Sequence, residues 1–352
     1  MYIHRVAEKI IHTLLDGPKV IIVLGARQVG KTTLIEHILR KKNSLILNFD
    51  IEVDKSRVSA ASSLPPLEGM LALGNPSILV IDEAQRLPEA GKTVKGWYDA
   101  RVPAKIILLG SSSLNLLDQA AESLTGRNEK VYLPPLTFEE VIRSRTWHSP
   151  RFTSEILKKN FSNQIQSILL QLIVYGSYPE TILTSNKERY LINLASDYLL
   201  KDILQSSLVK SPELVKKLLM LVAYQAGSEV SINELASNLQ ISRQTVERYL
   251  ELLERTFVIF RLPAFSKNQR KEIVKSTKIF FWDNGVRNAL LKEFSLSPYR
   301  GDIGSLWENW VIAEFAKRNL LEDQRHNLYF WRTRDGSEVN LVIKTGTALM
   351  LI

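Results

Sequence analysis

One stretch near the amino terminus, residues 20–39 (VIIVLGARQVGKTTLIEHIL), most constrains how this 352-residue chain can fold. Residues 20–24 are β-branched or leucine, a composition that favours a strand buried on both faces of a parallel sheet. Gly25 to Thr32 then fit the spacing G-x-x-x-x-G-K-[ST], and a helical pattern begins at Thr33. A buried strand, a glycine-rich turn and a helix in this order predict an α/β fold with a parallel sheet.

The glycine-rich turn has the residues that hold the phosphates of a nucleotide. Gly25 and Gly30 let the backbone wrap around phosphate, and the N–H groups at the start of the helix point at the anion. Lys31 is expected to reach the β and γ oxygens and Thr32 to hold Mg²⁺. The turn therefore predicts ATP and Mg²⁺ as ligands.

A second apolar run, residues 77–88 (SILVIDEAQRLP), ends in two adjacent carboxylates. In a P-loop ATPase the first acid, Asp82, would hold Mg²⁺ through water, and Glu83 would polarise the attacking water. A kinase for a small molecule needs no second acid of this kind. The pair favours ATP hydrolysis, and a metabolite kinase stays a third alternative.

Two more runs complete the predicted sheet. Residues 44–55 (SLILNFDIEVDK) supply a strand with acids at its end, and residues 104–117 (AKIILLGSSSLNLL) supply one with serines at its tip. Because ligands bind at the carboxyl edge of such sheets, Ser112 or Ser113 is expected to sense the γ-phosphate. Arg127 is a candidate arginine finger, in cis or in trans, with a solvated surface arginine as the alternative.

The predicted ATPase site has three sets of residues. The catalytic set is Glu83, Lys31 and Arg127, and the metal ligands are Thr32 and Asp82. The nucleotide-binding set is Gly25, Ala26, Arg27, Gln28, Val29, Gly30, Lys31, Thr32, Thr33, Ser112 and Ser113.

The order of several motifs resembles a family of bacterial and archaeal AAA+-related ATPases. These motifs are LGARQVGKTTL, LNFD, ILVIDEAQRLPE, ILLGSSS, SLTGR and LTFEE, followed by YGSYPE, DYLLKDIL, WENWVIAEF and WRTRDGSEVNLVI. The resemblance implies a P-loop NTPase sheet with an extra strand between the Walker A and Walker B strands. It also implies a helical lid, a winged helix-turn-helix and a PD-(D/E)xK nuclease-like carboxy-terminal domain. The corresponding predicted boundaries are 1–135, 136–210, 211–282 and 283–352.

Residues 211–282 predict a winged helix that contacts DNA, with a protein-docking winged helix as the alternative. Capping signals at Ser211, Ser231 and Ser242 begin three helices, and β-rich segments follow. The third helix carries three acids and three bases, which cancel. The wing region compensates, since residues 261–292 contain eight Lys or Arg against two acids, a balance of 8 − 2 = +6.

The nuclease-like segment is predicted to be inactive. Glu308 matches the helix acid of a PD-(D/E)xK site, but Asn340 stands where the family usually has Asp. Asn is a neutral and weaker Mg²⁺ ligand, and the sequence ends at ALMLI, before the Glu-x-Lys of the family pattern. We therefore expect a remnant that does not cut DNA, and a truncated end.

Composition limits the location and the partners. The chain has no cysteine and no apolar run long enough to cross a bilayer, and its amino terminus lacks a secretory cleavage site, so we expect a cytoplasmic protein. A formal net charge of +9 is compatible with an anionic partner or with a merely solvated surface. Oligomer formation stays open.

Two functions from different classes are the leading hypotheses. The first is an ATP-hydrolysing switch or remodeller coupled to DNA or to a partner protein through the winged helix. The second is a nucleotide-gated DNA-binding or protein-interaction module with negligible turnover.

Overall fold

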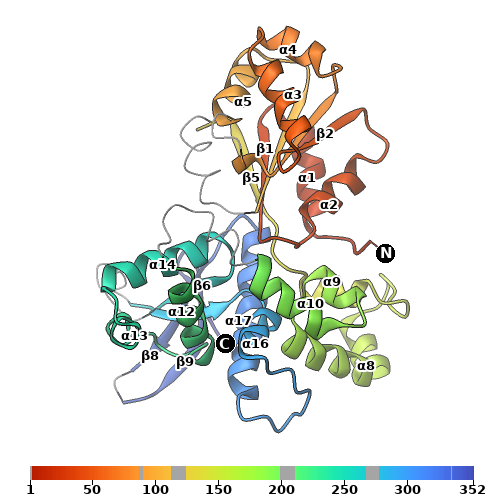
Figure 1. Ribbon diagram of the computed structural model, residues 1–352. Helices are drawn as coiled ribbons and strands as arrows, with labels where there is room; N and C mark the ends of the chain where they lie inside the picture. The colour runs from red at the N-terminus through yellow and green to blue at the C-terminus, as the bar shows by residue number, and fades with distance from the viewer. Residues whose placement is uncertain (1, 87–89, 112–123, 199–210, 267–276, 334) are drawn as a thin grey trace. The chain divides into compact units, whose positions relative to one another are not determined.

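The computed structural model describes residues 2–86, 90–111, 124–198, 211–266, 277–333 and 335–352 (Figure 1). The chain divides into two compact units. The amino-terminal unit comprises residues 4–133, and the carboxy-terminal unit comprises residues 134–352 together with residues 1–3. None of the described helices is both long and apolar enough to cross a membrane.

The amino-terminal unit is built on a five-stranded parallel sheet with the order β2-β3-β4-β1-β5. Its strands are β1 (Val20–Leu24), β2 (Ser44–Asn48), β3 (Ile78–Asp82), β4 (Lys105–Gly110) and β5 (Asn128–Tyr132). Every residue of β1 and β3 is buried, as expected for strands covered on both faces. Strand β4 lies between β1 and β3, so the predicted α/β fold, with an extra strand between the glycine-rich turn and the acid strand, is confirmed.

Short helices precede and connect these strands. They are α1 (Ala7–Leu15), α2 (Lys31–Leu39), α3 (Glu52–Ser62), α4 (Pro66–Ala72), the 3-10 turn η1 (Ala84–Arg86) and α5 (Ala90–Asp99). Helix α1 packs on β1, β5 and α2, while α3 packs on β2 and α4 contacts both α3 and α5. Figure 1 shows α3, α4 and α5 grouped at one end of this unit, away from α1 and α2.

The carboxy-terminal unit combines helices with two small antiparallel sheets, β6-β7 and β8-β9-β10. Its strands are β6 (Ile259–Pro263), β7 (Thr277–Phe281), β8 (Asn327–Arg332), β9 (Glu338–Thr345) and β10 (Ala348–Leu351). Its first helices are α7 (Phe138–Arg143), α8 (Ser154–Tyr175), α9 (Pro179–Leu183), α10 (Lys187–Asn193) and the π-helical turn η2 (Leu194–Tyr198). The later helices are α12 (Pro212–Tyr224), α13 (Ile232–Leu239), α14 (Arg243–Arg255), α16 (Asn284–Leu291) and α17 (Ile303–Leu321).

Helices α12, α13 and α14 and the β6-β7 hairpin occupy the segment predicted as a winged helix. Ser231 and Ser242 accept hydrogen bonds from backbone N–H groups in the first turns of α13 and α14. On α14, Val246, Leu250 and Leu253 are fully buried, which agrees with the periodicity of the sequence. Identification of this segment as a winged helix, and of the four domain boundaries, stays a prediction.

A buried polar network joins α8, α16 and α17. Asp283 caps α16 by accepting hydrogen bonds from the backbone N–H groups of Gly285 and Val286, at 2.9 and 3.3 Å. Its other carboxylate oxygen accepts a 2.6 Å hydrogen bond from the backbone N–H of Ser177. Burial raises the pKa of Asp283, and the nearby charge of Lys317 partly offsets this rise. Buried polar groups with this many partners fix one packing of the three helices.

This network also explains the glycine of the motif YGSYPE. Gly176 ends α8 with a φ of 69°, and a Cβ at this position would lie 1.8 Å from Oδ1 of Asp283. Any side chain larger than hydrogen would therefore displace the cap of α16. The glycine of this motif is therefore required for packing between the end of α8 and the start of α16, which are about a hundred residues apart in the chain.

We expect Asp283→Ala to lower the free energy of unfolding of the carboxy-terminal unit by about 2–4 kcal/mol. The change removes the cap of α16 and a negative charge near the buried Lys317. Urea unfolding followed by tryptophan fluorescence measures this loss. Five of the six tryptophans belong to the carboxy-terminal unit, and only Trp97 belongs to the amino-terminal unit. The exposed Asp335→Ala should stay within about 0.5 kcal/mol of wild type, and equal losses from both changes would contradict the role of the cap.

Candidate functional site

The glycine-rich turn between β1 and α2 is shaped by close backbone approaches. Gly25 lies so near the end of β5 that a Cβ there would be 2.2 Å from the carbonyl oxygen of Leu133. Gly30 precedes α2 with a φ of 91°, a left-handed conformation that favours glycine. Between the two glycines, residues differ in exposure: Ala26 and Val29 are buried, Arg27 is half-buried and Gln28 is exposed.

The first residues of α2 bring the lysine and threonine of the motif to the acid strand. Nζ of Lys31 donates hydrogen bonds of 2.9 Å to the carbonyl oxygens of Gly25 and Ala26, so this buried ammonium lies across the turn. Oγ1 of Thr32 donates a 2.5 Å hydrogen bond to Oδ2 of Asp82 at the end of β3. The two predicted metal ligands are therefore adjacent although fifty positions separate them in the sequence.

Glu83 sits just beyond β3 in a strained backbone conformation, with a φ of 49°. Its backbone N–H donates to Oδ1 of Asp82 at 2.8 Å. Its carboxylate accepts a short hydrogen bond from the side-chain amide of Gln85 and one of 3.3 Å from the hydroxyl of Ser111. Gln85 and Ser111 also contact each other at 3.1 Å, so three side chains form one polar cluster at this edge of the sheet.

Sequence reasoning missed Gln85 and Ser111. Ser111 is buried at the end of β4, one position before the two serines that we expected to sense the phosphate. Ser112 and Ser113 themselves lie outside the described residues. The serine run did point to the tip of this strand, but the pattern alone could not choose among three consecutive serines.

Arg5 is a second residue that sequence reasoning missed. Its buried guanidinium donates a 2.9 Å hydrogen bond from Nη1 to the carbonyl oxygen of Val29 in the glycine-rich turn. Its backbone N–H donates to Oε1 of Glu8 in the first turn of α1, at 2.7 Å. The segment before α1 therefore supports the turn, and no motif in the sequence signals this long-range contact.

Within the amino-terminal unit, Arg127 lies at the opposite edge of the sheet from the glycine-rich turn. Its carbonyl oxygen accepts a 2.9 Å hydrogen bond from the N–H of Val20, the first residue of β1. The glycine-rich turn follows Leu24, the last residue of the same strand. Five strand residues separate these ends by about 16 Å. Its guanidinium pairs with Asp99 at 2.7 Å, which raises the pKa of Arg127. A finger role in trans stays a prediction.

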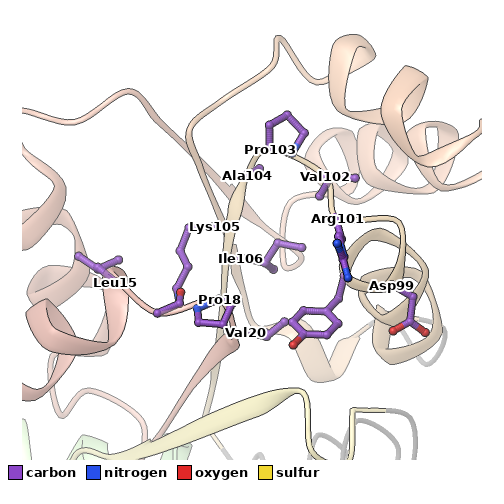
Figure 2. A pocket seen from close by; sticks show the side chains of 12 residues that line it. Leu15, Pro18, Val20, Asp99, Arg101, Val102, Pro103, Ala104, Lys105 and Ile106 are labelled. Carbon is purple, nitrogen blue, oxygen red and sulfur yellow. The ribbon is translucent and has the colours of Figure 1, made fainter.

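A cavity of about 750 Å³ lies at this same amino edge of the sheet (Figure 2). Its lining includes Pro18, Val20, Asp99 and Lys105. Nζ of Lys105 donates hydrogen bonds of 2.5–2.6 Å to three backbone carbonyl oxygens before β1, and burial lowers the pKa of this lysine. Because Val20 and Lys105 begin their strands, this cavity is across the sheet from the predicted phosphate site and does not form part of it.

In the carboxy-terminal unit, one of the two predicted nuclease-like residues, Glu308, contacts a buried lysine. Nζ of Lys278 in β7 is 2.9 Å from Oε1 of Glu308 in α17, and it also pairs closely with Glu338 at the start of β9. Asn340 is exposed two residues further along β9. Glu308 thus forms an ion pair with Lys278. The role of Glu308 and Asn340 as a nuclease remnant stays a prediction.

Ion pairs reduce the positive charge that the sequence count assigned to the wing region. Arg261 pairs with Glu247 at 3.0 Å, Lys278 pairs with Glu308, and Arg287 pairs with Asp302 at 2.5 Å. Of the other five cations, Lys292 is exposed, while Lys267, Arg270, Lys271 and Lys275 lie outside the described residues. The count of +6 is therefore not a measure of surface charge.

Comparison with known families matches three parts of the chain. Residues 17–142 match a model described as an AAA domain. Residues 166–297 and 303–352 match models described as domains of unknown function, DUF8612 and DUF4143. The first match covers the whole parallel sheet and every described residue of the predicted ATP site.

The chain is also similar to uncharacterised proteins of Mycobacterium tuberculosis and Methanocaldococcus jannaschii. The first is 29% identical over 342 residues, which cover 94% of this chain and 68% of the relative. The second is 27% identical over 351 residues, which cover 96% of this chain and 75% of the relative.

Among solved structures, the Walker-type ATPase of Pyrococcus abyssi is similar with a TM-score of 0.56 and 18% identity. The match covers 82% of this chain and 96% of that chain. At this identity the likeness shows the fold. Together with the AAA-domain match and the geometry of the glycine-rich turn, it supports a nucleotide-binding P-loop ATPase domain in residues 17–142.

Proposed function

We propose that this protein binds and hydrolyses ATP with Mg²⁺ and uses the nucleotide state as a switch or remodelling step. The hydrogen bond between Thr32 and Asp82 carries the proposal, because it brings the Walker A hydroxyl and the Walker B carboxylate to one point. Hydroxyl and carboxylate oxygens are the hard ligands that Mg²⁺ prefers. Both side chains therefore fit the metal that the fold family uses.

Each residue of the site has a role that its position supports. Thr32 and Asp82 would hold Mg²⁺, which would neutralise charge on the phosphates of the nucleotide. Lys31 exchanges the carbonyl oxygens of Gly25 and Ala26 for phosphate oxygens, which are stronger acceptors because they are charged. The backbone N–H groups at the start of α2 bind the same anion.

Glu83 would act as the general base for the attacking water. Its hydrogen bonds with Gln85 and Ser111 hold its carboxylate beyond the end of β3. The strained φ of Glu83 supports this role, since such conformations concentrate at functional sites. Gln85 and Ser111 are positioning residues for this carboxylate.

The finer proposal is that the switch acts through the carboxy-terminal unit on DNA or on a partner protein. Three helices followed by the antiparallel pair β6-β7 support a winged helix, and serines cap α13 and α14, although the expected cap of α12 at Ser211 makes no side-chain hydrogen bond. Arg243 and Gln244 are exposed at the start of α14. The ion pairs of Arg261, Lys278 and Arg287 weigh against a broad basic surface. A nucleotide-gated binding module with negligible turnover is the alternative function.

We expect Glu83→Gln to lower steady-state ATP turnover by about 100-fold or more while ATP binding is kept. The amide cannot accept the proton of the attacking water. Phosphate release measures turnover, and fluorescence titration with a labelled ATP analogue measures binding. Glu68→Gln makes the same charge change at an exposed site on α4 and should leave both unchanged.

Tight ATP binding with wild-type turnover slower than one event in many minutes, also in the presence of DNA, would contradict hydrolysis as the working step. It would favour the gated binding module. Equal turnover in Glu83→Gln and wild type would instead reject the assignment of Glu83 as the base.

We expect Arg243→Ala to weaken binding of double-stranded DNA and to reduce the slope of log affinity against log salt by about 1. Loss of one phosphate contact releases one counterion fewer. Fluorescence anisotropy at two salt concentrations measures the slope, and Lys42→Ala, an exposed cation of the other unit, is the matched control. Absence of DNA binding by wild type at low salt would point to a protein partner.

A further inference from the structure

Three potential metal ligands meet on the amino-terminal unit, outside the ATP site. His4 precedes α1, Glu8 lies in the first turn of α1, and His37 lies in the last turn of α2. Their ligand atoms all lie within 4.8 Å of one another. Across the described residues, this is the one group of three or more histidine and acidic side chains that is close enough to share an ion.

The three side chains are close to one another, and two of them are already in contact. Nδ1 of His4 is 3.2 Å from Oε2 of Glu8, and the rings of His4 and His37 meet edge to face with centroids 5.5 Å apart. Ligand atoms of a tetrahedral zinc site are about 3.3 Å apart. The pair of His4 and Glu8 already has this spacing. The side chain of His4 is 78% exposed, so it can turn toward His37 without displacing buried atoms.

Glu8 is held in place independently of the two histidines. The backbone N–H of Arg5 donates a 2.7 Å hydrogen bond to Oε1 of Glu8, and the side chain of Glu8 is 17% exposed. The backbone thus orients the carboxylate, and both of its oxygens lie within 3.3 Å of Nδ1 of His4. A ligand fixed by such an outer contact loses less freedom when a metal binds.

A surface ion pair is the simpler explanation for part of the group. His4 and Glu8 are four positions apart along the chain and in contact at 3.2 Å, so they can form an ion pair without a metal. Such a pair places no requirement on His37, which comes from another helix. The convergence of two imidazoles and one carboxylate from three segments is the observation that an ion pair leaves unexplained.

We propose that His4, Glu8 and His37 form a binding site for a divalent transition-metal ion, of which Zn²⁺ is the representative. Imidazole nitrogens select such ions over Mg²⁺ and Ca²⁺, which prefer oxygen ligands. Three protein ligands leave one position of a tetrahedral site for water. The proposal is independent of ATP hydrolysis, because none of the three residues belongs to the ATP site.

The site would tie the segment before α1 to the helix that follows the glycine-rich turn. Arg5, next to His4, donates its side-chain hydrogen bond to the carbonyl oxygen of Val29. His37 is on the same helix as Lys31. A bound ion therefore holds together two segments that both contact the phosphate-binding turn.

Zn²⁺ titration of the untagged, metal-free full chain tests the proposal, with a chromophoric chelator as competitor and thermal unfolding as a second readout. We expect one equivalent of Zn²⁺ to bind and to raise the melting temperature by about 4 °C or more at saturation. His4→Gln and His37→Gln should each weaken binding at least about tenfold. Co²⁺ in place of Zn²⁺ should give the visible absorption of a tetrahedral site in wild type but not in the His4 or His37 variant.

His12→Gln is the matched control, because His12 is an exposed histidine of α1 outside the group. It should bind Zn²⁺ as wild type does. His4 is exposed, so the His4 variant keeps the test valid even where His37→Gln fails to fold. No Zn²⁺ binding by wild type, or equal binding by wild type and by the folded His4 variant, would overturn the proposal.

Discussion

The parallel pairing of five strands is the constraint on which the amino-terminal unit depends. In a parallel sheet all strands end at one edge, so residues that follow β1, β3 and β4 must meet there. The position of β4 between β1 and β3 then puts Ser111 next to Glu83. Thr32, on the helix after β1, reaches Asp82 from the same edge. The chemistry of the site is a consequence of this register.

The same logic separates Arg127 from the site. It precedes β5, and the amino ends of parallel strands gather at the other edge. There it pairs with Asp99 beside the cavity whose lining includes Lys105. Within the amino-terminal unit Arg127 therefore lies at the opposite edge of the sheet from the turn, and its role as an arginine finger stays a prediction.

In the carboxy-terminal unit, buried polar groups fix the arrangement of the elements, as strand pairing does in the amino-terminal unit. Asp283 satisfies backbone N–H groups from α16 and from the residue after Gly176, and Asn309 bonds both backbone groups of Phe281. Such contacts specify one arrangement of the helices, since a shift of any one of them leaves a buried group without a partner. The polar and charged side chains that make these contacts are bonded within the protein, so they are not available to bind a partner, although the sequence alone cannot show this.

The sequence predicted the features whose physical cause is local. An apolar run, two glycines at fixed spacing and a following helix dictate the phosphate-binding turn, and an apolar run ending in Asp82 and Glu83 dictates the acid strand. Serines before α13 and α14 cap them because capping needs only neighbours along the chain. These predictions needed no knowledge of which strands pair.

Contacts between distant segments were decided by the tertiary structure alone. The support of Val29 by Arg5, the cluster of Glu83 with Gln85 and Ser111, and the pairing of Arg127 with Asp99 depend on strand order and helix packing. Hydrogen bonds and ion pairs act over a few ångströms, whereas sequence spacing carries no distance between segments that fold back on one another. The sequence by itself therefore determined the phosphate-binding turn and its chemistry, and the tertiary structure decided which other side chains could reach it.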